Sequence, residues 1–105
     1  MFDKLASLDA RYNQLTEQMA QPDVATDHVR LQQIAREQRE LEDVVMAYRA
    51  FNDADRQAQE AQQLFDEADD PELRTMAQDE LEQLRARRES LADQIKLLLL
   101  PRGKK

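Results

Sequence analysis

The apolar residues of this chain recur at alternating steps of three and four, which is the spacing of amphipathic helices. In the first segment they are Leu5, Leu8, Tyr12, Leu15 and Met19. Pro22 ends the segment, because proline disfavours helical conformation in the residue before it. The pattern predicts a helix over residues 2–20, followed by a break at Gln21-Pro22-Asp23-Val24.

A second apolar stripe runs without a helix breaker as far as Asp69. Its members are Leu31, Ile34, Gln38 as a polar interruption, Leu41, Val44, Val45, Tyr48, Phe51, Ala54, Ala58, Ala61, Phe65 and Ala68. The two successive three-residue steps after Tyr48 are typical of local overwinding. Thr26 or Asp27 is suited to cap the start. The stripe predicts one helix over residues 27–68, about 60 Å long at 1.5 Å per residue.

A third helix is predicted over residues 71–100. Asp70 is a natural N-cap, Pro71 suits the first helical position, and Glu72 favours the positive end of the helix dipole. Pro101 stops the helix. Its stripe comprises Leu73, Ala77, Leu81, Leu84, Leu91, Ile95 and Leu98, and Arg88 occupies one position where an apolar residue is expected.

Short connections make neighbouring helices antiparallel, so the fold class is all-α. We expect a three-helix antiparallel bundle whose second and third helices extend as a two-helix coiled-coil arm, because the first helix is too short to reach past about residue 46. The register pairs Leu15 with Leu31 and Ala58 with Leu84. Residues 1–101 then form one helical domain, and residues 102–105 form a basic tail expected to be disordered.

Composition narrows the function classes. The 105 residues include a single glycine, Gly103, and no cysteine. Glycine-dependent phosphate loops and nucleophile elbows therefore have nowhere to form, and no cofactor is expected. The N-terminus lacks a signal-peptide pattern, and the longest apolar run, Leu97 to Leu100, is too short to cross a membrane. A cytoplasmic protein with no membrane or small-molecule partner is the default expectation.

The formal charge of −7 is concentrated in one segment. Residues 53–82 hold eleven acids against two bases, which gives −9 and leaves +2 elsewhere. This segment coincides with the predicted arm, and such a charge disfavours binding of a nucleic-acid backbone. The candidate partner-binding residues are the acids at the arm's end, Asp66, Glu67, Asp69 and Asp70.

Other polar groups have a functional and a structural interpretation. His28 is the only histidine, and without further histidines or cysteines a solvated position is favoured over a metal site. The acid pairs Asp66/Asp70, Asp79/Glu82 and Glu42/Asp43 are interpreted as solvated rather than catalytic, because helix surfaces offer no concave pocket. We therefore expect no catalytic and no metal-binding residues.

The basic group Arg85, Arg87 and Arg88 has no interleaved aromatic residues, so pairing with Glu82, Glu89 or acids across the arm is favoured over RNA contact. The tail bases Arg102, Lys104 and Lys105 are either an RNA-facing tether or an arbitrary end of the chain. Leu97, Leu99 and Leu100 exceed what a two-helix stripe requires. Either the first helix covers them, or they dock against a segment absent from this chain.

Five short segments, in this order, resemble the start of bacterial class I peptide chain release factors, closest to the type that reads UAA and UAG. They are Met1-Phe2-Asp3-Lys4-Leu5 followed by Tyr12 and Leu15; Pro22-Asp23-Val24; Glu42 through Tyr48-Arg49; Asp70-Pro71-Glu72-Leu73; and Leu97-Leu98-Leu99-Leu100-Pro101. The resemblance covers the chain up to Pro101 and corresponds to the family's N-terminal helical domain.

The resemblance implies a role in translation termination. In that family, later domains read the stop codon and trigger peptidyl-tRNA hydrolysis with a Gly-Gly-Gln loop, which one glycine cannot form, so the chain is not expected to be an enzyme by itself. The implied partners are the stalk base of the large ribosomal subunit and the glutamine methyltransferase of release factors. A truncated domain or a free-standing paralogue both fit. The alternative function is a stand-alone coiled-coil adaptor or oligomerisation module.

Overall fold

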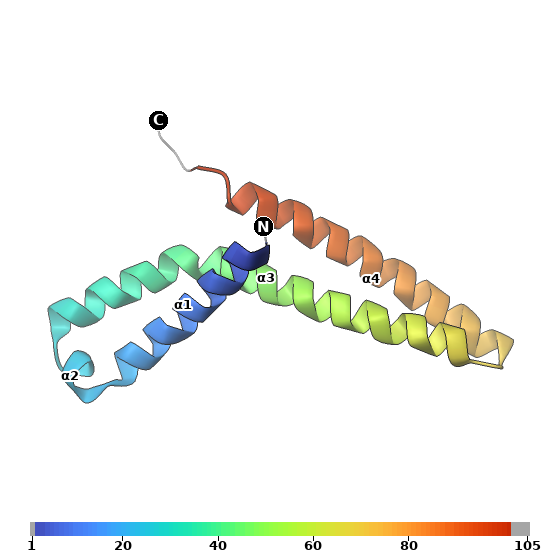
Figure 1. Cartoon of the computed structure of the whole chain (residues 1–105), viewed down its shortest axis with the longest axis horizontal. Helices are drawn as coiled ribbons and strands as arrows, with labels where there is room; N and C mark the ends of the chain where they lie inside the picture. Colours follow the sequence, from blue (N-terminus) through green and yellow to red (C-terminus); the bar gives the residue numbers. More distant parts are fainter. Residues whose placement is uncertain (1, 102–105) are drawn as a thin grey trace. The chain divides into compact units, whose positions relative to one another are not determined.

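The computed structural model describes residues 2–101, and none of these residues lies in a strand. The helices are α1 (Phe2–Ala20), α2 (Pro22–Ala25), α3 (His28–Glu67) and α4 (Pro71–Leu98), as Figure 1 shows. The prediction of an all-α fold is confirmed. The chain forms two compact units, residues 1–48 and residues 49–105, and α3 contributes to both. The two units are described separately below.

In the first unit, α1 lies alongside the first half of α3 (Figure 1). Leu5 and Leu15 on α1 are fully buried, and the other members of the predicted first stripe are half-buried. On α3 the buried residues of this unit are Val44, Val45 and Ala47. The stripe predicted from the 3–4 spacing therefore faces the core of this unit.

The connection between α1 and α3 differs from the prediction. The segment predicted as a simple break contains the one-turn helix α2, which begins at Pro22 after an extended Gln21 (φ −69°, ψ 134°). Val24 is only 2% exposed, so this turn adds an apolar side chain to the core. Proline fits the first position of a helix because its missing N–H has no partner there. The same residue thus ends α1 and starts α2.

Asp27 caps α3, which was one of the two predicted caps. Its Oδ1 accepts a hydrogen bond from the backbone N–H of Arg30 at 3.2 Å. The hydroxyl of Thr26 instead donates to the carbonyl oxygen of Pro22 at 2.8 Å and so closes α2. The two neighbouring residues therefore serve two different helices.

Polar contacts fix the register of α1 against α3. Arg11 binds Glu37 through both ends of its guanidinium fork, with Nε–Oε2 at 2.7 Å and Nη2–Oε1 at 2.9 Å. The amide of Gln38 donates to the carbonyl of Tyr12 at 3.2 Å and to the hydroxyl of Thr16 at 2.5 Å. The polar interruption in the α3 stripe is therefore satisfied by α1.

In the second unit, α4 returns along the second half of α3 (Figure 1). Ala58, Ala61, Leu81 and Leu84 form one buried cluster, so the predicted pairing of Ala58 with Leu84 is confirmed. Further buried residues are Ala54, Ala68, Ala77, Leu91 and Ile95. Alanine on one helix faces leucine on the other, which lets the two backbones approach closely.

Both ends of α4 follow the local sequence. The Oδ1 atom of Asp70 accepts from the backbone N–H of Glu72 at 3.1 Å, with Pro71 at the first helical position, as predicted. The helix ends at Leu98, two residues before the predicted end. Leu100 N–H bonds to the carbonyl of Leu97 at 3.2 Å, a tighter last turn before Pro101.

Three leucines of α4 and its C-terminal end are exposed. Leu73, predicted to lie in the stripe, is 37% exposed, because the antiparallel register places it opposite the α3–α4 turn rather than opposite a helix. Leu97 and Leu100 are exposed, and Leu99 is half-buried. The predicted basic tail at residues 102–105 lies outside the described residues.

The Arg11–Glu37 pair predicts a pH dependence. The hydrogen bond from Arg11, helped by Coulomb attraction and opposed by partial desolvation, lowers the pKa of Glu37. A carboxylate with a lowered folded-state pKa stabilises the fold above its unfolded pKa of about 4.3, and the contribution is lost as pH falls through the folded value. Urea unfolding of the Glu37→Gln variant should therefore show a shallower loss of stability below about pH 4 than the wild type.

The matched control is Glu40→Gln, which changes an exposed acid one turn further along the same helix. It should retain the wild-type pH slope. Equal slopes for Glu37→Gln and the wild type would contradict the assignment of this pH dependence to the ion pair.

Candidate functional site

The four candidate acids lie where α3 turns into α4. Asp66 and Glu67 belong to the last turn of α3, and Asp69 and Asp70 belong to the connection. All four are exposed. We call residues 64–76 the tip, and the second half of α3 together with α4 the arm. The structure therefore brings the predicted partner-binding residues together on one surface feature.

Local hydrogen bonds orient most of these acids. Gln62 Nε2 donates to Asp66 at 2.9 Å, and Gln63 Nε2 donates to Glu67 at 3.1 Å, each one turn away on α3. Asp70 accepts from the α4 backbone as described above. Amide and backbone donors are neutral, so these bonds position the carboxylates without cancelling their charge.

Arg74 on α4 contacts Phe65 on α3 at the tip, and the apolar spacing does not predict this contact. Its guanidinium carbon lies 4.4 Å from the centroid of the Phe65 ring, a cation–π contact between α4 and α3. Its Nη1 atom also lies 3.5 Å from the carbonyl oxygen of Ala68. The sequence does place an aromatic residue and an arginine on either side of a short turn between two helices, and that arrangement could have predicted a cation–π contact. Arg74, one of the two bases within residues 53–82, therefore connects α4 to α3 at the acidic turn.

Two arginines of the basic group further along α4, Arg85 and Arg88, contact α3. Arg88 Nη1 lies 2.5 Å from Asp55 Oδ1 on α3, and both side chains are partly buried. Arg85 Nη2 lies 3.0 Å from Gln62 Oε1, so its partner is an amide rather than an acid. The predicted pairing across the arm is confirmed for Arg88. An arginine fits into the apolar stripe here because its charged end reaches out to a partner at the edge, beside the small Ala58.

The remaining candidates stay apart from any such assembly. His28 is exposed, and its Nε2 lies 3.4 Å from Gln32 Nε2 on the same helix. Within residues 2–101, no group of three or more histidines, cysteines or acids is placed to hold a metal ion. All members of the acid pairs Asp66/Asp70, Asp79/Glu82 and Glu42/Asp43 are exposed. An exposed helix surface lacks the concave, water-excluding pocket in which carboxylates act as catalysts.

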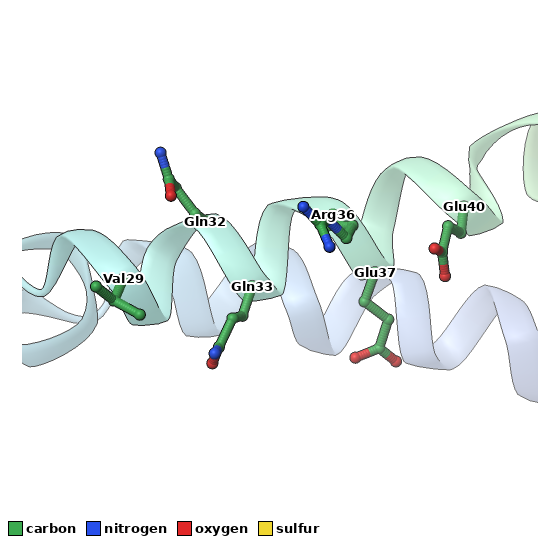
Figure 2. A pocket seen from close by; sticks show the side chains of 6 residues that line it. All are labelled: Val29, Gln32, Gln33, Arg36, Glu37 and Glu40. Carbon is green, nitrogen blue, oxygen red and sulfur yellow. The ribbon is translucent and has the colours of Figure 1, made fainter.

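One surface hollow lies on α3 in the first unit. Figure 2 shows its lining side chains, all contributed by this helix: Val29, Gln32, Gln33, Arg36, Glu37 and Glu40. Gln32 and Gln33 point away from one another, and the six groups do not converge on a point. A binding site for a small molecule needs convergent polar groups in an enclosed space. This hollow provides neither.

The sequence profile of the PCRF domain family matches residues 8–105. The chain belongs to the PCRF domain family. The resemblance to bacterial class I release factors noted from five short segments is thereby confirmed over most of the chain.

The curated relatives of this PCRF domain are bacterial release factors. Peptide chain release factor 1 of Geobacillus kaustophilus is 38% identical over 102 residues, which is 97% of this chain and 28% of the relative. The same-named proteins of Oceanobacillus iheyensis and Bacillus subtilis are 38% and 33% identical, each over 97% of this chain and 29% of their own length. The chain therefore spans less than a third of the relatives it matches.

No solved structure matches this chain. Within residues 2–101, none of the helices of this PCRF domain combines the length and hydropathy that a membrane span needs.

The cap at Asp70 gives a test of how the tip is built. Asp70→Ala removes the side-chain acceptor for a backbone N–H of α4 and should cost about 1 kcal/mol of unfolding free energy, whereas Asp70→Asn keeps the acceptor and should cost only a few tenths. Urea unfolding followed by circular dichroism measures both. Asp69→Ala is the control, with an expected change within about 0.5 kcal/mol. Equal losses for Ala and Asn at position 70 would show that charge, rather than capping, stabilises this end.

Proposed function

We propose that this chain is a docking domain of a translation-termination factor, and that its acidic arm binds a protein partner of the termination machinery. The observation that carries the proposal is the similarity to release factor 1 proteins over 97% of the chain. The arm supports it, because an exposed group of acids on a fixed turn is a feature that a partner can recognise.

Charge makes the arm suited to rapid association. Residues 53–82 carry −9, and the tip acids are exposed rather than paired across the arm. A field of this kind raises the association rate of a basic partner and is screened over about 8–10 Å at ordinary salt. The proposed partner therefore presents a basic protein surface.

Two partners are consistent with the family. One is the protein at the stalk base of the large ribosomal subunit, and the other is the methyltransferase that modifies the catalytic glutamine of release factors. Both are protein surfaces, in agreement with an acidic arm that disfavours contact with RNA. The proposed place of action is the cytoplasm, where translation is terminated in bacteria.

The chain is proposed to act without catalysing peptide release. Its one glycine, Gly103, excludes a Gly-Gly-Gln loop within these 105 residues. Purified chain added to a ribosome stalled at a stop codon should release no peptide above background, measured with a labelled peptidyl-tRNA. A full-length release factor 1 serves as the positive control. Release by the chain alone would overturn the docking-only proposal.

Association kinetics test the role of the acids. A variant with Asp66→Asn, Glu67→Gln, Asp69→Asn and Asp70→Asn should bind the stalk-base protein or the methyltransferase more slowly at low salt, because the attractive field at the tip is removed. The difference should shrink at high salt. Stopped-flow measurements at two ionic strengths give both numbers, and circular dichroism checks that the helices are retained.

A charge-matched control separates local from global charge. Glu17→Gln, Glu40→Gln, Glu42→Gln and Asp43→Asn together remove the same charge from exposed positions in the first unit. This variant should keep most of the wild-type association rate. If the tip variant associates as fast as the wild type at low salt, the acidity serves solubility and the docking surface lies elsewhere.

A further inference from the structure

The two sides of the arm differ in their contacts. The three contacts described above that cross from α4 to α3 involve Arg74, Arg85 and Arg88. At 100° per residue these three positions fall within about 60° of one another around α4. The cross-helix ties therefore lie along one side of the arm, which we call the tied side.

The opposite side of the tip exposes large apolar side chains. Leu73 and Met76 lie about 100° and 160° from Arg74 around α4, and Leu64 lies about 100° from Phe65 around α3, away from the tied side. Their exposed fractions are 37% for Leu73, 66% for Met76 and 41% for Leu64. A grouped set of exposed apolar residues on an otherwise highly charged segment is characteristic of an interaction surface. We call these three residues the apolar side of the tip.

Acids surround the apolar side. Glu67 follows Leu64 by three residues, Glu72 precedes Met76 by four, and Glu80 follows Met76 by four, so each lies next to an apolar residue on its helix surface. All three acids are exposed. The surface thus has an apolar centre and an acidic rim, as protein-binding sites commonly have an apolar centre and a polar rim.

We propose that the apolar side of the tip, Leu64, Leu73 and Met76 with their acidic rim, binds a basic amphipathic segment of a partner protein. This inference rests on the proposed docking function and specifies the chemistry of the partner. Apolar side chains of the segment cover the leucines and the methionine, and its lysines or arginines face the glutamates. The acids then speed the encounter, while apolar burial sets how long the complex lasts.

Charge selects this occupant over two others. A second copy of the chain would bring two segments of −9 together, which opposes self-association through the tip. A nucleic acid would set its phosphates against the glutamate rim. A basic protein segment satisfies both parts of the surface, and methionine suits such a site because its flexible side chain adapts to different partners.

Methionine methyl resonances can report the site directly. The chain has four methionines, and Met46 is 40% exposed in the first unit, so it is an internal control for Met76. The probe is a synthetic helical peptide with leucines at 3–4 spacing and lysines elsewhere. We expect the Met76 methyl signal to shift on titration while the Met46 signal stays in place.

Two substituted variants of the chain and a peptide of opposite charge complete the test. Replacing Leu73→Ser and Met76→Ser together should weaken peptide binding by roughly tenfold or more, the loss typical of removing a buried anchor. Val29→Ser, at a 64% exposed apolar residue of the first unit, should leave it unchanged. The same peptide with glutamate in place of lysine should not bind. Absence of binding by the lysine peptide, equal shifts of Met46, equal binding of the glutamate peptide, or dimerisation of the chain through Met76 would each overturn the proposal.

A second experiment separates this inference from the proposed function. Cosedimentation with purified large ribosomal subunits is measured for the wild type, the Leu73→Ser/Met76→Ser variant and Val29→Ser. Loss of cosedimentation in the double variant alone supports both proposals. Peptide binding at Met76 without cosedimentation of the wild type would leave the surface in place and overturn the ribosomal partner. Cosedimentation unaffected by the double variant would overturn the apolar side as the docking surface and leave the docking function standing.

Discussion

The close packing of α3 against α4 is the constraint on which the arm depends. The α3 stripe is built from alanines, and its partners on α4 are leucines, so small residues face large ones within one buried cluster. Larger side chains at Ala58 or Ala61 would push the helices apart, and overpacking of this kind typically costs about 1–3 kcal/mol. The short separation also decides which polar side chains reach across the arm. Arg88 meets Asp55 directly because the backbones between them are close.

Polar contacts orient helices whose attraction is mainly apolar. In the first unit, the fork of Arg11 on Glu37 and the amide of Gln38 on α1 fix one register among those that the apolar spacing allows. In the arm, Arg85 and Arg88 do the same along one side only. Exposed ion pairs contribute little stability individually. Their value here is geometric, since the cross-helix contacts described above lie along one side of the arm.

Periodicity predicted the helices and most of the core, because burial in a helical pair depends on a spacing that the sequence displays. Asp70 was predictable as a cap for the same local reason. The burial of Val24 is not predictable from spacing. Pro22 both ends α1 and starts α2, and only the packed structure shows that this short helix turns Val24 into the core.

The spacing of apolar residues does not show whether a residue lies beyond the end of the opposing helix. Leu73 fits the stripe by spacing, yet it lies beyond the end of the opposing helix and is therefore exposed. The contact between Arg74 and Phe65 depends on the geometry of the turn, which spacing does not encode. The candidate acids lie at the end of the arm, where the sequence predicts them, whereas the spacing gives no sign that Leu64 and Met76 beside them are exposed.

The continuity of α3 restricts how this chain can change in length. One inserted or deleted residue within His28–Glu67 would rotate every following side chain by about 100° around the helix axis. Within the second half of α3, such a change would turn part of the alanine stripe away from α4. A change in length at either connection, around Asp27 or around Asp69, would leave the faces of the helices unchanged. An insertion is therefore expected to be tolerated at the turns and to disrupt packing within α3.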